Sequence, residues 1–83
     1  MHKLEIVKQL VYCFEEMNLR VKAIIYKSSD GYYEFSLSHY YRPEEGASTY
    51  YPSCGDSSLS LVEAKLEYYM SNFSADYIEN KDF

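Results

Sequence analysis

The sequence predicts an α+β fold made of a helix, a three-stranded antiparallel meander and a second helix, with both helices on one face of the sheet. Three observations predict this αβββα order. The spacing of apolar residues changes from helical to alternating and back to helical along the chain. Gly and Pro mark the turns between these segments, and a length of 83 residues allows one hydrophobic core. We therefore expect residues 1–83 to form a single domain.

Residues 3–17 are expected to form the first helix. Charged and amide side chains take one side of this segment, and its apolar residues recur at steps of three and four, namely Ile6, Val7, Leu10, Val11, Phe14 and Met17. Asn18 follows the last of them and can take the left-handed conformation that ends a helix. Cys13 is then expected to lie near the apolar face of the helix as a small buried residue.

Residues 20–41 are expected to form two strands of a β-hairpin. Residues of opposite character alternate from Arg20 onward, as they do in a strand. Ser29-Asp30-Gly31 is typical of a three-residue hairpin loop that ends with Gly in the left-handed region. This loop fixes the register and places the following residues opposite one another: Lys27 and Tyr33, Ile25 and Phe35, Ala23 and Leu37, and Val21 and His39.

The rest of the chain is expected to complete the meander and add the second helix. Pro and Gly predict a turn over residues 42–46, and a short third strand should follow over residues 47–51. Ser60 and Glu63 have the spacing of a capping box, and one helical face would carry Val62, Leu66, Tyr69, Met70 and Phe73, so we expect a helix over residues 60–73. Residues 74–83 are a short acidic segment, either one extra helical turn or a frayed tail. The expected core is Leu10, Phe14, Ile25, Phe35, Leu37, Leu66, Met70 and Phe73.

The charge distribution favours a protein partner over a nucleic acid. The net charge is −5, and the whole excess of acidic residues lies in residues 42–83. Binding to phosphate groups requires clustered Lys and Arg, so we expect no direct contact with nucleic acid and a partner protein with a basic surface. We expect no membrane contact, because apolar runs are far shorter than the ~20 residues of a spanning helix. The start of the chain lacks a signal peptide, which predicts a cytoplasmic protein.

No set of residues has the spacing of a catalytic, cofactor-binding or metal-binding site. His2 is close to the end of the chain and His39 lies near a strand end, so neither is placed as a base for Cys54. The chain has three Gly and no Gly-rich phosphate loop, and its two Cys and two His lack the spacing of a zinc site. We therefore expect a protein without enzymatic activity, cofactor or metal.

Tyrosines and glutamates are the candidate partner-binding residues. The chain has 11 Tyr, several of them in adjacent pairs that send one ring to each face of a strand. The outward rings would lie on the open sheet face, where Tyr is typical of binding surfaces, although Tyr is also simply a good strand former. Glutamates could imitate phosphate groups, or they could be an ordinary solvated surface. The candidate residues are Tyr26, Tyr32, Tyr40, Tyr50, Glu44, Glu45, Glu63 and Glu67.

The chain resembles two groups of proteins. Its helix, three strands, helix order resembles the double-stranded RNA-binding domain, and residues 60–65 stand where that family has its S-K-K-x-A-K motif. Ala64 and Lys65 match this motif, whereas Leu61 and Val62 replace the lysines that grip phosphate. Small size, acidity and Tyr content resemble those of phage-encoded anti-CRISPR inhibitors.

The second resemblance implies a function. It implies a stoichiometric inhibitor that occupies a basic, nucleic-acid-binding surface of a host defence complex. The alternatives are a homodimeric or adaptor domain that uses the Tyr face, with the chain either a monomer or a homodimer, and a small hydrolase that uses Cys54.

Overall fold

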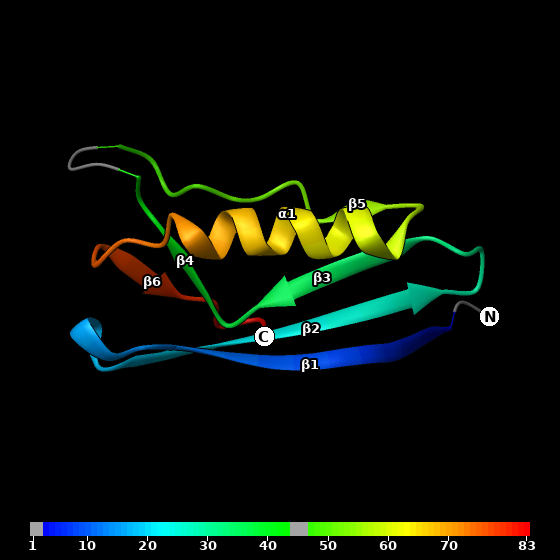
Figure 1. Cartoon of the computed structure of the whole chain (residues 1–83), viewed down its shortest axis with the longest axis horizontal. Coiled ribbons are helices and arrows are strands. Elements are labelled where there is room, and N and C mark those ends of the chain that lie inside the picture. The colour runs from blue at the N-terminus through cyan, green and yellow to red at the C-terminus, as the bar shows by residue number, and fades with distance from the viewer. Residues whose placement is uncertain (1–2, 44–46) are drawn as a thin grey trace.

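The chain begins with a long β-hairpin. The structure, a computed structural model, describes residues 3–43 and 47–83. Strand β1 (Leu4–Phe14) leads through the short 3-10 helix η1 (Glu15–Met17) into strand β2 (Leu19–Ser28), and the two strands pair along their whole length (Figure 1). The predicted helix over residues 3–17 is therefore wrong. Asn18 does take the left-handed conformation, with φ of 50°, but it ends η1.

A β-bulge explains why β1 has the apolar spacing of a helix. The pairing with β2 shifts by one residue between Ile6 and Lys8, which leaves Val7 as the extra residue. The shift reverses the alternation of side chains, so apolar residues on both faces fall at steps of three and four. The segment is also rich in β-branched and aromatic residues, and no preferred N-cap residue precedes it.

The hairpin between β2 and β3 (Tyr33–Leu37) confirms the predicted register. Gly31 has φ of +84° in the loop, and the predicted pairs from Lys27 with Tyr33 to Ala23 with Leu37 are all formed. The predicted pair of Val21 with His39 is not formed. At Ser38 the chain leaves the first sheet, and residues His39–Tyr41 form a separate strand, β4.

Two short strands complete the sheets. Strand β5 (Gly55–Asp56) pairs with β3, so the first sheet has the order β1-β2-β3-β5. Strand β6 (Tyr77–Glu79) pairs with β4 in a second, two-stranded sheet, where an extra helical turn or a frayed tail was expected. The predicted strand over residues 47–51 is reduced to one bridge between Tyr50 and Tyr41.

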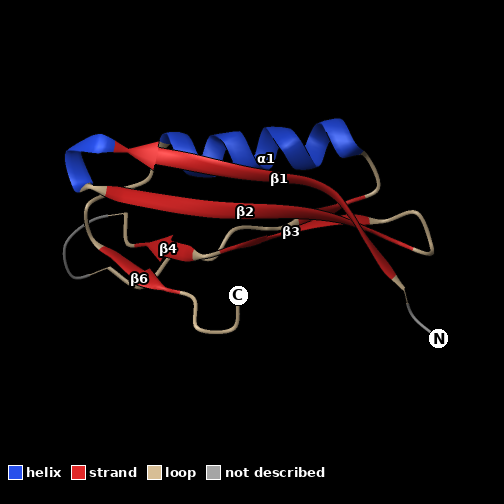
Figure 2. Cartoon of the chain, turned by 90° about the horizontal axis from the view of Figure 1, so that it is seen from below, coloured by secondary structure: helices blue, strands red, loops and turns tan. Residues whose placement is uncertain are grey.

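The one α-helix among the described residues, α1 (Leu59–Ser71), confirms the second predicted helix to within two residues. Its N-cap is Ser58, whose side chain accepts a hydrogen bond from the backbone N–H of Leu61, and not Ser60. Figure 2 shows α1 on one side of the first sheet and β6 and the C-terminus on the other. The structure has 45% strand, with one α-helix and two sheets in residues 3–43 and 47–83, so the αβββα fold class is wrong, and so is the topological resemblance to the double-stranded RNA-binding domain.

The core lies between α1 and the face of the sheet that carries Val21, Ala23 and Ile25. Of the predicted core residues, Ile25, Phe35, Leu37, Leu66 and Met70 are buried, whereas Leu10, Phe14 and Phe73 are partly buried at its margin. Val21, Ala23, Tyr41, Val62 and Tyr69 are also buried. No helix in the described part of the chain has the length and apolar content that crossing a membrane requires.

Candidate interaction surface

The face of the first sheet that lies opposite α1 is the candidate interaction surface, and we call it the outer face. Residues directly opposite each other in antiparallel strands share a face. Since Val21, Ala23 and Ile25 are buried beneath α1, the even-numbered residues of β2 and their partners lie on the outer face. These are Leu4, Ile6, Gln9, Val11, Cys13, Arg20, Lys22, Ile24, Tyr26, Glu34 and Ser36.

Strand β1 makes the outer face apolar at the edge of the sheet. Ile6 and Val11 are each 56% exposed and Leu4 is 44% exposed, all on the outer face, while the bulged residue Val7 is exposed beside them. Single exposed apolar residues are ordinary, but several on one edge strand are typical of an interaction site. The exposed apolar surface of the outer face therefore lies mainly along β1 and not at the predicted tyrosines.

The segment after β6 borders the outer face and forms cavities with it. Two cavities of about 330 and 320 Å³ share Lys22 and Phe83 as lining residues. The first also has Arg20 and Lys81 in its lining, and among the described residues none of these three cations forms an ion pair. The outer face therefore combines apolar side chains along β1 with a charged end, where Glu79 lies beside these three cations.

The structure does not bring the predicted tyrosines together. Tyr26 lies on the outer face, half-buried. Tyr32 lies one residue before the start of β3. Its ring approaches Gly55 so closely that a Cβ added to Gly55 would be 2.6 Å from Cε1 of Tyr32. Tyr40 belongs to β4, where its ring contacts Tyr51 with centroids 4.9 Å apart.

Tyr50 belongs to an aromatic cluster beside α1, whereas Tyr26 lies on the outer face. Its ring contacts Tyr41 and Tyr69, with centroids 5.7 and 5.2 Å apart, and Phe73 extends the same cluster. The Tyr69 hydroxyl donates a 2.6 Å hydrogen bond to the Tyr50 carbonyl, and burial raises the pKa of Tyr69. These rings form part of the core around α1, so the tyrosines in this cluster have a structural role.

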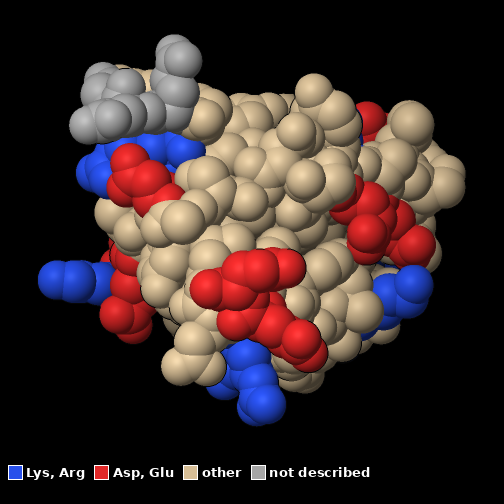
Figure 3. Space-filling view, turned by 60° about the vertical axis from the view of Figure 1, so that its left-hand side comes forward, with Lys and Arg blue, Asp and Glu red and all other residues tan. Residues whose placement is uncertain are grey.

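The predicted acidic residues do not form one surface either. Glu63 accepts a 3.1 Å hydrogen bond from Lys8, and Glu67 accepts a 2.6 Å bond from the Tyr12 hydroxyl, so both connect α1 to β1. Burial and the bond to Glu67 raise the pKa of Tyr12. Glu44 and Glu45 lie outside the described residues. In the view of Figure 3 the acidic side chains form separate groups with Lys or Arg beside each.

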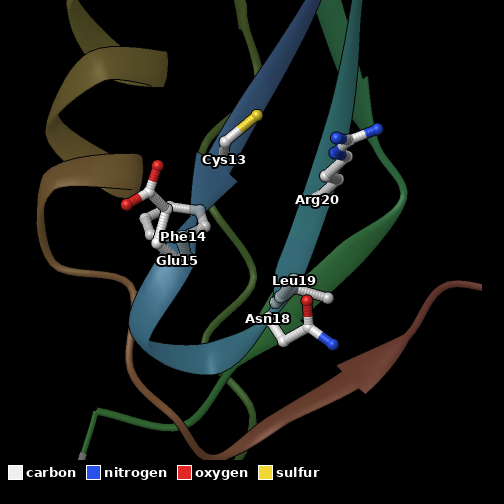
Figure 4. A pocket seen from close by; sticks show the side chains of 6 residues that line it. All are labelled: Cys13, Phe14, Glu15, Asn18, Leu19 and Arg20. Carbon is white, nitrogen blue, oxygen red and sulfur yellow. The ribbon is translucent and has the colours of Figure 1, made fainter.

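Both cysteines are exposed in the described part of the chain. Cys13 is exposed on the outer face and lines a 480 Å³ pocket at the β1–β2 turn; its expected burial was wrong. Figure 4 shows that the other side chains lining this pocket come from residues 14–20 and include no histidine. Cys54 is also exposed. His39 Nδ1 lies 2.8 Å from the Ser38 hydroxyl, whose oxygen also accepts a 2.8 Å bond from the Lys22 N–H.

Within the part of the chain that the structure describes, no three His, Cys, Asp or Glu side chains gather in a way that could hold a metal ion. No protein-family model matches the chain, and comparison with curated proteins and with solved structures finds no significant similarity. The surface itself must therefore carry any functional proposal.

Proposed function

We propose that this chain is a protein-binding domain without enzymatic activity, and that it binds its partner through the outer face and the adjoining β1 edge. The observation that carries the proposal is the exposure of Leu4, Ile6, Val7 and Val11 on the strand that ends the sheet. Burying such side chains contributes about 25 cal/mol per Å² of apolar surface, which favours association.

The apolar surface of the outer face and the cavity beside it support a specific contact. Half-buried Tyr26 and Ile24 continue the apolar surface from β1 toward the sheet centre. Arg20, Lys22 and Lys81 line a cavity at one end together with Glu79, so charged groups border the apolar surface there. A surface with an apolar centre and a charged rim is typical of transient protein interfaces.

The narrower hypothesis of an anti-CRISPR-like inhibitor with an acidic contact surface stays a prediction, with less support. Three acidic side chains, Asp56, Glu63 and Asp76, already form ion pairs within the chain. The outer face carries charges of both signs, Arg20 and Lys22 together with Glu34, and its exposed apolar residues lie along β1. A partner that meets the outer face should accordingly offer mainly apolar groups rather than a basic groove.

Site-specific photocrosslinking tests the proposal. A benzophenone amino acid placed at Ile6 or Val11 should give discrete adducts in cell extract, because both side chains project from the proposed contact surface. The same group at Tyr68, which is 67% exposed on α1, is the matched control and should give none. An excess of unlabelled chain should suppress the adducts, whereas an excess of the double variant Ile6→Asp, Val11→Asp should not.

Two results would contradict the proposal. Equal crosslinking from Tyr68 and from the two β1 positions would show that contact is not confined to the outer face. Full competition by the double Asp variant would show that the apolar side chains of β1 contribute no binding energy.

A further inference from the structure

The free edge of β1 has backbone groups whose directions follow from the neighbouring strands. The Lys22 carbonyl accepts a 2.9 Å hydrogen bond from Ser38 N, and Ser28 N donates a 2.8 Å bond to the Tyr32 carbonyl. Even-numbered residues of β2 therefore direct their backbone groups toward β3. Because successive residues of an antiparallel strand face opposite neighbours, Val21 and Ala23 direct theirs toward β1.

This alternation identifies which residues of β1 are left without backbone partners. Tyr12 is opposite Val21 and Leu10 is opposite Ala23, so the backbone groups of Tyr12 and Leu10 are bonded to β2. The intervening residues Gln9, Val11 and Cys13 must direct their N–H and C=O groups away from β2. In the view of Figure 1 no described segment lies below β1, and in the described sheet β1 pairs with β2 alone.

A row of unpaired backbone groups is complementary to another strand, and we infer that this strand is β1 of a second copy of the chain. The inference rests on the proposed function, since it names the partner of the same surface. The two β1 strands pair antiparallel about a two-fold axis at Val11. Val11 then lies opposite Val11 of the other copy, Gln9 opposite Cys13, and Leu10 opposite Tyr12.

The bulge at Val7 selects this register. Only the part of β1 after the bulge, from Lys8 to Phe14, keeps a regular alternation of side chains. Pairing this segment with itself about Val11 gives every outward-facing residue in it a partner. It also keeps outer-face residues opposite outer-face residues, because opposed residues share a face. A register shifted by one pair would leave backbone groups of Gln9 or Cys13 unpaired.

Charge favours a second copy over a strand from an unrelated protein. The chain has a net charge of −5, yet β1 carries one acidic residue, Glu5, and one basic residue, Lys8. Two copies can therefore meet along this edge without the repulsion that the rest of the chain would cause. In the proposed register Lys8 lies opposite Phe14 of the second copy and keeps its ion pair with Glu63 of its own chain, so no like charges face each other within the paired segment.

Sedimentation of matched variants tests the inference. The full chain should sediment as a reversible dimer of twice 9.8 kDa over the range of about 1 µM to 1 mM. Val11→Lys places two like charges face to face on the axis and should raise the dissociation constant about tenfold or more. Leu61→Lys is the matched control, because Leu61 is an apolar residue with a similar exposed fraction, 52%, and lies on α1; its effect should stay within about threefold.

Amide hydrogen exchange provides a second readout that a folding defect would not imitate. The amides of Gln9, Val11 and Cys13 should exchange about tenfold more slowly at high than at low protein concentration, whereas exchange of buried Ile25 should not depend on concentration. A chain that is monomeric at 1 mM would overturn the inference, as would a dimer that Val11→Lys leaves intact or Leu61→Lys weakens equally. If the purified chain is a monomer and crosslinks from Val11 join it to another protein, the inference of a second copy is wrong, whereas the proposed protein-binding function stands.

Discussion

Replacing Tyr69 with Phe should lower the free energy of unfolding by about 2 kcal/mol. The Tyr69 hydroxyl accepts a 3.2 Å hydrogen bond from the Tyr41 N–H and donates a 2.6 Å bond to the Tyr50 carbonyl, so one atom joins α1 to β4 and to the segment after it. The buried N–H of Tyr41 would lose its partner, which costs about 1–3 kcal/mol. Tyr50 is exposed, so water can replace its lost bond, and the total stays near the middle of that range.

Urea unfolding followed by circular dichroism measures this change. A loss of about 2 kcal/mol is a large part of the ~5–15 kcal/mol typical of a native domain, and it should lower the melting temperature by roughly 8–16 °C. Tyr68→Phe is the control, because Tyr68 is exposed one residue earlier on α1, and its effect should stay within about 0.5 kcal/mol. If Tyr69→Phe is as stable as the parent chain, the hydroxyl does not join these segments.

Three further predictions follow from other contacts. Ser38→Ala should cost about 1–2 kcal/mol, because the Lys22 N–H loses the acceptor that lies 2.8 Å away, and thermal melts against the parent chain would show it. Gly31→Ala should cost about 1 kcal/mol, because φ of +84° strains any residue with a side chain even though the space around Gly31 is open; an unchanged melting temperature would contradict this. Burial raises the pKa values of Tyr12 and Tyr69, so their contribution to stability is complete below the ordinary Tyr pKa of about 10 and is lost as the pH rises above it. Unfolding free energies measured from pH 8 to 11 should therefore fall only in the upper part of this range.

Local signals in the sequence were sufficient for the centre of the fold. The turn residue Gly31 and the alternation on both sides of it predicted the β2–β3 pairs, and the spacing of Val62, Leu66 and Met70 predicted α1. Both elements have one buried face and a regular period, so pattern and structure agree.

The sequence-based predictions are wrong where the regular alternation of side chains is interrupted or too short to detect. A bulge in an edge strand with apolar residues on both faces imitates helical spacing, and for this reason the sequence predicts a helix where β1 lies. Strands β5 and β6 have two and three residues, too few for alternation to be visible. The outer-face positions of β2, including Tyr26 and Lys22, could be predicted, but the exposed apolar residues of β1 that complete the candidate site could not.

The change of sheet at Ser38 makes the spacing between β3 and β4 a fixed quantity. Leu37 and Tyr41 are both buried, and Asn80 bonds to the Leu37 carbonyl through its side chain and to the Ser38 carbonyl through its backbone. An inserted or deleted residue between β3 and β4 would exchange the faces of Tyr40 and Tyr41 and move the carbonyls that Asn80 binds. Related chains should therefore vary in length in the stretch between β4 and β5, and keep the spacing from β3 to β4 constant.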